Sequence, residues 1–359
     1  MPNRLDEREI EAKSSMRSRV AVLAVGAVSI ALLSPVLREV YSSLGTAVRA
    51  NLLLVVLALA CSALGFVSTW ALQRLTLGLD RWSDVAAPQL SGNAASNLVP
   101  AGSALGLAIQ LRMLRHRGID LTRAMTSLMI AGLLSTVAGL CVFPALLVLP
   151  VGDHADLDLA SATRWGLVSL AVSVPIIVAL LRSDRVMRSI GNACYRSVRR
   201  LPRCHPPTDL ARRIVDERDR VRGVIARNKI RTAAAALGRG VSEYLALYAS
   251  LLAVGLRPSP VIVLAAFAAG NVAGMIPFTP GGLGFVEAGL GGVLVLAGAA
   301  EEQTAAAVAI YRLATTWLPV LAGVATYLVT RLSASVAVGR DEPMAPAVAD
   351  VAVQPASLV

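Results

Sequence analysis

An acid and a base lie inside apolar stretches near the end of the chain. Glu287 falls in the apolar run 283–299, and Arg312 falls inside a second run, 304–330. An ionisable side chain within a membrane-spanning segment is costly unless it is paired, and it commonly marks the path of a polar substrate. We therefore predict a Glu287–Arg312 ion pair. Two roles stay open: the pair holds the bundle together, or it faces a polar cavity and engages a lipid head group.

The residues before Glu287 cannot continue a regular helix. The stretch 270–287 reads GNVAGMIPFTPGGLGFVE, in which Pro277 and Pro280 each remove a backbone donor. Three glycines with unrestricted φ follow: Gly281, Gly282 and Gly284. Unpaired backbone groups cost several kcal/mol in hydrocarbon, so the break is tolerated only where protein or a wet cavity surrounds it. The glycines would also let the amides of a new helix start approach a phosphate.

A second broken segment lies in the first half of the chain. Residues 89–111, QLSGNAASNLVPAGSALGLAIQL, have the length of a span. Polar residues, proline and glycine interrupt it at Asn93, Asn97, Pro100, Gly102 and Gly106. Both broken stretches carry Gly-Asn-x-Ala, then an apolar pair before proline, then glycines ending in Leu-Gly. An internal repeat is one interpretation and chance is the other. Broken helices at corresponding positions of two halves are typical of alternating-access carriers.

Composition places the chain among multi-pass membrane proteins. Apolar residues make up 55% of the chain, the mean hydropathy is +0.65, and no soluble domain is visible. The net charge of +11 comes from arginines gathered between the apolar runs, while aromatics make up only 4%. This is the positive-inside pattern, and it excludes a nucleic-acid surface. The four cysteines show neither a disulfide framework nor zinc spacing, so we predict no metal and no cofactor.

The expected fold class is an all-α helix bundle with about six full spans and two re-entrant or broken segments. The spans are predicted at 20–37, 51–73, 124–149, 165–181, 233–256 and 304–330. If residues 75–88 are cytoplasmic, segment 89–111 enters and leaves by one face as a re-entrant hairpin; otherwise it spans the membrane. Segment 260–299 is either a second such hairpin or two full spans. Loop charges place both termini in the cytoplasm, with an N-terminal tail at 1–19, a membrane domain at 20–332 and a disordered tail at 333–359.

The longest polar segment, 182–231, is strongly basic. One interpretation is an orientation-setting cytoplasmic loop with short amphipathic helices, and the other is a surface for anionic lipid head groups. Glu243, in the span that follows, either snorkels to the membrane boundary or faces a cavity.

Two motifs resemble those of a known family. IPFTPGGLGFVEAGL, followed by AVAIYRLATTWLPVLAG, is similar to the C-terminal signature of the lysylphosphatidylglycerol synthase transmembrane family, also described as a flippase-like domain. NLVPAGSALG resembles that family's first-half motif, so the similarity covers roughly residues 18–332. The resemblance implies a bacterial or archaeal inner-membrane protein that moves or presents lipids. It implies these site residues: Asn97, Pro100, Gly102, Asn271, Pro277, Pro280, Gly281, Gly282, Gly284, Glu287, Tyr311 and Arg312.

The chain departs from this family pattern in two places. Where many members have a carboxylate after the first-half motif, this chain has Ser103 and Ala104, and residues 124–140 lack the Glu-Arg pair of the next helix. The first-half site is therefore neutral. Members that make lysyl- or alanyl-phosphatidylglycerol add a soluble aminoacyltransferase domain, whereas this chain ends at Val359. We expect that it does not perform that transfer alone.

The expected function is translocation or binding of a phospholipid or lipid-linked substrate. The sequence has no GxxxxGK[ST] loop, so transport would be facilitated, ion-coupled or exchange-driven. We find no intramembrane carboxylate pair, no His cluster and no metal-ligand spacing, so we do not expect an enzyme. The expected partners are membrane lipids, with a homo-oligomer or a separate membrane-associated enzyme left open. The alternatives are a module that presents a polyprenyl-linked substrate to a glycosyltransferase, and a structural subunit.

Overall fold

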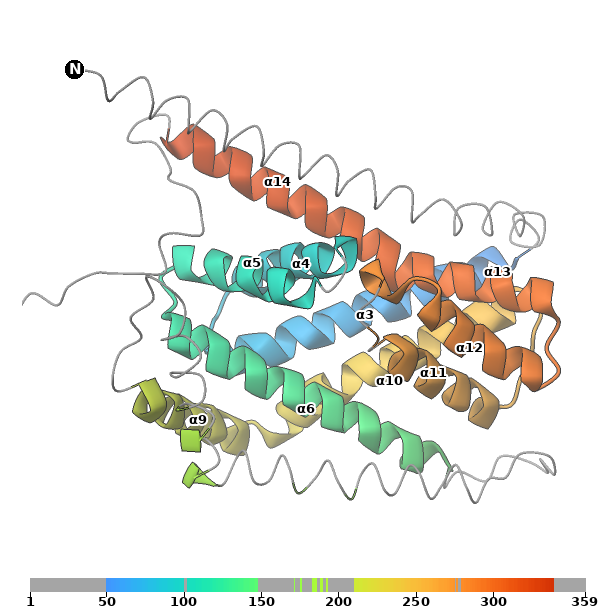
Figure 1. Cartoon of the computed structure of the whole chain (residues 1–359), viewed down its shortest axis with the longest axis horizontal. Helices are drawn as coiled ribbons and strands as arrows, with labels where there is room; N and C mark the ends of the chain where they lie inside the picture. Colours follow the sequence, from blue (N-terminus) through green and yellow to red (C-terminus); the bar gives the residue numbers. More distant parts are fainter. Residues whose placement is uncertain are drawn as a thin grey trace, which may run out of the picture. The chain divides into compact units, whose positions relative to one another are not determined.

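The computed structural model describes residues 50–99, 102–147, 171, 175, 183–185, 188–189, 192, 210–274, 276 and 279–338. Every regular element in these residues is helical, and Figure 1 labels the main ones. They are α3 (Leu52–Leu77), α4 (Ser83–Leu98), α5 (Ser103–His116), α6 (Leu121–Leu147), α9 (Leu210–Arg227), α10 (Lys229–Ala253), α11 (Pro260–Gly274), the 3-10 turn η1 (Pro280–Gly282), α12 (Phe285–Leu296), α13 (Glu301–Arg312), the π-helical turn η2 (Leu313–Trp317) and α14 (Leu318–Val338). The predicted span 20–37 lies outside the described residues, as does 165–181 apart from two positions.

Among the described residues, three stretches are long and apolar enough to cross a membrane. They are Leu52–Leu77, Leu121–Gly139 and Glu301–Thr330. These stretches overlap the predicted spans 51–73, 124–149 and 304–330. Helix α14 continues to Val338, beyond the domain end expected at 332.

The chain divides into two compact units. Unit 1 comprises Met1–Ala60, Gly92–Ala108 and Tyr244–Ala322. Unit 2 comprises Cys61–Ser91, Ile109–Glu243 and Gly323–Val359. Every residue that the sequence singled out for the candidate site belongs to unit 1.

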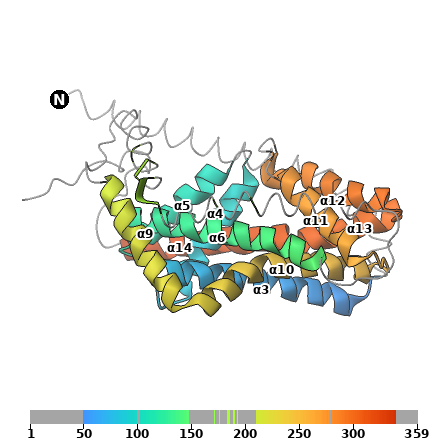
Figure 2. The same ribbon diagram turned by 90° about the horizontal axis from the view of Figure 1, so that it is seen from below.

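Helices α11 and α12 form a tight antiparallel hairpin in unit 1, and Figures 1 and 2 both show them side by side. A Cβ on Gly270 would lie 2.7 Å from Cγ of Leu290, and one on Gly289 would lie 2.8 Å from the carbonyl oxygen of Ala269. The 15 and 12 residues of these helices give lengths of about 22 and 18 Å. The hydrocarbon core is about 30 Å thick. These lengths favour the short hairpin over two full spans for 260–299.

Helices α4 and α5 form the broken segment of the first half, with the break at 99–102. A Cβ on Gly106 of α5 would lie only 1.8 Å from Oγ of Ser96, so the two helices are packed against each other. Their 16 and 14 residues correspond to about 24 and 21 Å. Helix α4 begins earlier than the predicted position 89 and includes Pro88. Both halves thus hold two short helices around a break, which agrees with an internal repeat.

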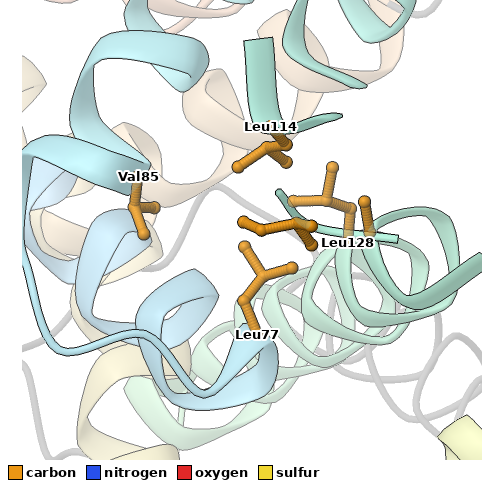
Figure 3. Packing of buried hydrophobic residues seen from close by; sticks show 6 residues of the cluster. Leu77, Val85, Leu114 and Leu128 are labelled. Carbon is orange, nitrogen blue, oxygen red and sulfur yellow. The ribbon is translucent and has the colours of Figure 1, made fainter. Parts of the chain in front are cut away.

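In unit 2, the guanidinium groups of two arginines donate hydrogen bonds to carbonyls at the C-terminal end of α3. Arg123 donates to the carbonyl of Leu77 through Nε at 3.1 Å and Nη2 at 2.6 Å, and Arg220 Nη2 donates to the carbonyl of Thr76 at 2.9 Å. Cations stabilise a helix C-terminus because its last carbonyls lack intrahelical partners. Figure 3 shows the neighbouring apolar cluster, which includes Leu77, Val85, Leu114 and Leu128.

The part of the basic segment that the structure describes is mostly one 18-residue amphipathic helix, α9, which packs against α6. The guanidinium of Arg218 is 2% exposed and donates to the carboxylates of Asp184 and Asp219. Helix α10 begins at Lys229, earlier than the predicted position 233. On α10, Glu243 pairs with Arg239 of the same helix at 3.0 Å. That carboxylate is therefore held by a local partner one turn away.

Candidate functional site

Residues 280–287 form a turn built on glycine that leads from α11 into the start of α12, and we call this turn the corner. Pro280 opens the short turn η1, and three glycines have positive φ: Gly281 at 59°, Gly282 at 67° and Gly284 at 82°. An L side chain in this region costs about 1–2 kcal/mol, so the backbone path itself selects glycine. Gly282 is also buried, and a Cβ there would lie 3.3 Å from Cα of Gly274. These glycines therefore adopt positive φ angles, as their predicted conformational freedom allows.

Glu287 caps the helix that leaves the corner. It stands in the first turn of α12, and its Oε2 accepts a hydrogen bond from the backbone N–H of Gly284 at 2.7 Å. A carboxylate is favourable there because the first amides of a helix lack partners and the helix dipole is positive at this end. A backbone amide at this helix start was predicted to approach a phosphate. The amide of Gly284 instead already binds an anion of the chain itself, the carboxylate of Glu287.

Arg312 ends α13 and closes the corner from the other side. Its side chain is 8% exposed, and that of Glu287 is 16% exposed. Nε donates to Oε1 of Glu287 at 2.7 Å, and Nη2 donates to the carbonyl of Gly281 at 2.8 Å. The predicted ion pair is therefore present. The guanidinium also pairs a carbonyl that the non-helical backbone would otherwise leave bare.

A π-helical turn, Leu313–Trp317, follows Arg312. Within it, the hydroxyl of Thr316 accepts a hydrogen bond from Nη1 of Arg312 at 3.0 Å. Single π turns inside α-helices often mark functional positions. Thr316 was not among the predicted site residues. Its position, one turn after a charged residue inside an apolar run, is the sequence signal that could have identified it.

Asn97, in the last turn of α4, lies against the corner formed in the second half of the chain. A Cβ on Gly281 would be 3.0 Å from Oδ1 of Asn97. The Nδ2 of Asn97 donates to the carbonyl of Asn93 at 2.8 Å and to its Oδ1 at 3.3 Å. The two broken segments therefore meet inside unit 1. Asn93 was predicted only as an interruption of segment 89–111 and not as a site residue.

The other described site residues have local roles in their own helices and turns. Asn271 is exposed, and its Nδ2 donates to the carbonyl of Phe267 on its own helix at 2.9 Å. Tyr311 is buried on α13 beside Arg312. Gly102 forms the turn before α5, where its N–H donates to the carbonyl of Val99 at 2.9 Å. Pro100 and Pro277 lie outside the described residues.

A comparison with protein families matched residues 19–323 to the family described as "Lysylphosphatidylglycerol synthase TM region". The chain belongs to the lysylphosphatidylglycerol synthase transmembrane family. The match spans both broken segments and the Glu287–Arg312 pair, and it confirms the resemblance seen in the motifs. The protein is therefore a multi-pass, all-helical membrane bundle of the flippase-like type. A comparison with curated proteins gave no match. Within the described residues, no group of His, Cys, Asp and Glu side chains is arranged to hold a metal ion.

Proposed function

We propose that this family member binds the head group of a phospholipid or lipid-linked substrate at the corner formed by residues 280–287 and Arg312, and carries it across the membrane. The observation that supports this proposal most strongly is the pairing of Arg312. One guanidinium, almost fully buried, binds a carboxylate and a non-helical backbone carbonyl together. Such groups persist at membrane depth only where protein or a polar cavity surrounds them.

The geometry supports the binding of an anion at this corner. The carboxylate of Glu287 occupies a helix N-terminal amide and a guanidinium, at 2.7 Å each. These two donors are also the ones that bind phosphate in other proteins. Arg312 has five N–H groups and uses three of them in hydrogen bonds to described residues. A lipid phosphate can therefore bind the guanidinium beside the carboxylate, while Glu287 keeps both of its hydrogen bonds.

We further propose an inner-membrane location with both termini in the cytoplasm. The support is the positive-inside rule, since α9 and the polar segment around it carry many arginines. The family match covers a membrane region, so aminoacyl transfer and ATP hydrolysis are not part of the proposed activity. Its partners would be membrane lipids, with a second copy of the chain or a separate membrane enzyme as additional candidates.

Transbilayer movement of a labelled phospholipid in reconstituted liposomes tests the proposal. We expect Glu287→Gln and Arg312→Gln to slow the movement severalfold, because each leaves its buried partner uncompensated. The matched control is Glu243→Gln, which breaks an Arg–Glu pair along one helix in unit 2 and should keep the native rate. Equal rates for the native chain and Glu287→Gln would remove this role from the corner.

A double-substitution cycle separates a purely structural pair from a functional one. If the pair only holds helices together, the loss of transport should be proportional to the loss of stability in Glu287→Ala, Arg312→Ala and the double variant. If the pair engages substrate, transport should fall further than stability. Lipid that co-purifies in native mass spectrometry without any transbilayer movement would instead favour the presenting module.

A further inference from the structure

We propose that Asn93 contacts the substrate directly, and that the site selects head groups rich in hydrogen-bond acceptors, such as phosphate and hydroxyl oxygens, over head groups that end in an ammonium. This inference rests on the proposed function, because it assigns the substrate class of the same corner.

The carboxamide of Asn93 holds a buried donor that has no partner among the residues that the structure describes. Its Nδ2 atom is shielded from solvent and makes no hydrogen bond to them, whereas its Oδ1 accepts from Nδ2 of Asn97. Because Nδ2 of Asn97 is a donor, the atom of Asn93 that faces it must be the oxygen Oδ1. The amide nitrogen of Asn93 is therefore the atom that lacks a partner. A buried donor that lacks an acceptor is destabilising. An acceptor supplied by a ligand would satisfy it.

Asn93 is linked to the ion pair within unit 1 through two hydrogen-bonded pairs and one packing contact. Asn97 bonds to Asn93 and lies against Gly281, and the carbonyl of Gly281 accepts from Arg312. A ligand that reaches Arg312 through the corner therefore lies along the same polar path as Asn93.

Counted over the described residues, this path has N–H donors without a partner but no carboxylate that is still free to bind a ligand. Arg312 has five N–H groups and makes three hydrogen bonds to described residues. Both oxygens of Glu287 are already occupied. The other carboxylates in the described part of unit 1 belong to Glu301 and Glu302, which start α13, about 15 Å along the helix axis from Arg312. A terminal ammonium needs acceptors and a negative charge, so this site fits it poorly.

Competitive lipid binding, followed by native mass spectrometry on the full chain, tests the inference. The probes are phosphatidylglycerol, whose head group ends in hydroxyls, and phosphatidylethanolamine, whose head group ends in an ammonium. We expect the native protein to retain phosphatidylglycerol at least about fivefold better, the ratio that one net hydrogen bond provides. Asn93→Leu should remove most of that preference, and Asn93→Asp should reverse it because it replaces a donor with a negatively charged acceptor.

The matched control is Thr304→Val, which removes another buried, unpartnered polar atom of unit 1, on α13. It should keep the native lipid ratio. Equal retention of the two lipids by the native chain, or an unchanged ratio in both Asn93 variants, would overturn the inference. A selective chain that moves no lipid across liposomes would leave the inference standing and refute the proposed translocation, so the two failures can be told apart.

Discussion

Replacing Gly281 with alanine probes the corner at the point where backbone conformation and packing both demand glycine. Gly281 has φ 59° and ψ 19°, in the left-handed region, where an alanine costs about 1–2 kcal/mol. The new Cβ would also lie 3.0 Å from Oδ1 of Asn97, closer than ordinary contact. Displacing that carboxamide adds about 1 kcal/mol, the low end of the range for overpacking. We expect Gly281→Ala to destabilise the protein by about 2–3 kcal/mol in total.

Gly255→Ala is the matched control for the conformational part of this cost. Gly255 also belongs to unit 1 and has φ 87°, but nothing lies within 4 Å of its Cβ position. Gly255→Ala should therefore lower the free energy of unfolding only by the conformational cost and not by the packing cost. The difference of about 1 kcal/mol changes the unfolding equilibrium constant about fivefold, which an SDS titration in mixed micelles resolves.

The Asn97 contact predicts a specific coupling. In an Asn97→Ala background the excess cost of Gly281→Ala should disappear, because the next atoms of residue 97 lie 3.5 Å or more from the new Cβ. Gly281→Ala should also slow lipid movement more than Gly255→Ala does, since a shifted corner moves the carbonyl that accepts from Arg312. Equal destabilisation by the two alanines, or an excess that persists without the Asn97 carboxamide, would refute the contact.

Three further outcomes follow from the structure and the topology. Arg123→Gln should destabilise unit 2 by about 2 kcal/mol in the same titration, because a charged donor to the last carbonyl of α3 is lost; an unchanged midpoint would contradict the capping role. The hydrogen bond from Arg218 lowers the pKa of Asp184, so this contact should stabilise α9 at neutral pH and be lost only as pH falls below about 4; after correction for intrinsic exchange, hydrogen-exchange protection of α9 should drop there in the native chain and show no such step in Asp184→Asn. The loop that holds Glu301 and Glu302 has no Lys or Arg nearby, which favours the outer face, whereas Arg227 ends the arginine-rich helix α9. In a chain freed of its native cysteines, single cysteines at Arg227 and Glu301 should therefore be labelled from opposite faces of the membrane; labelling from one face would overturn the proposed orientation.

The sequence by itself determined the class of protein and the position of its breaks. Apolar runs, arginine-rich loops and the residues PGGLG are local features, and each restricts the backbone or its solvent directly. The ion pair could also be predicted, because an arginine in an apolar run needs a partner and Glu287 is the deep carboxylate nearest to it in the sequence. The structure confirms that pair at 2.7 Å.

Only the tertiary structure decided which polar groups share the corner. Local patterns fix the face of a helix on which a side chain stands, but not the distant segment it meets, because that depends on how short helices pack. Asn97 therefore came to lie on Gly281, and Asn93 was left with a buried donor. Asn271 aligns with Asn93 in the shared Gly-Asn-x-Ala motif, yet it is exposed and bonded to its own helix.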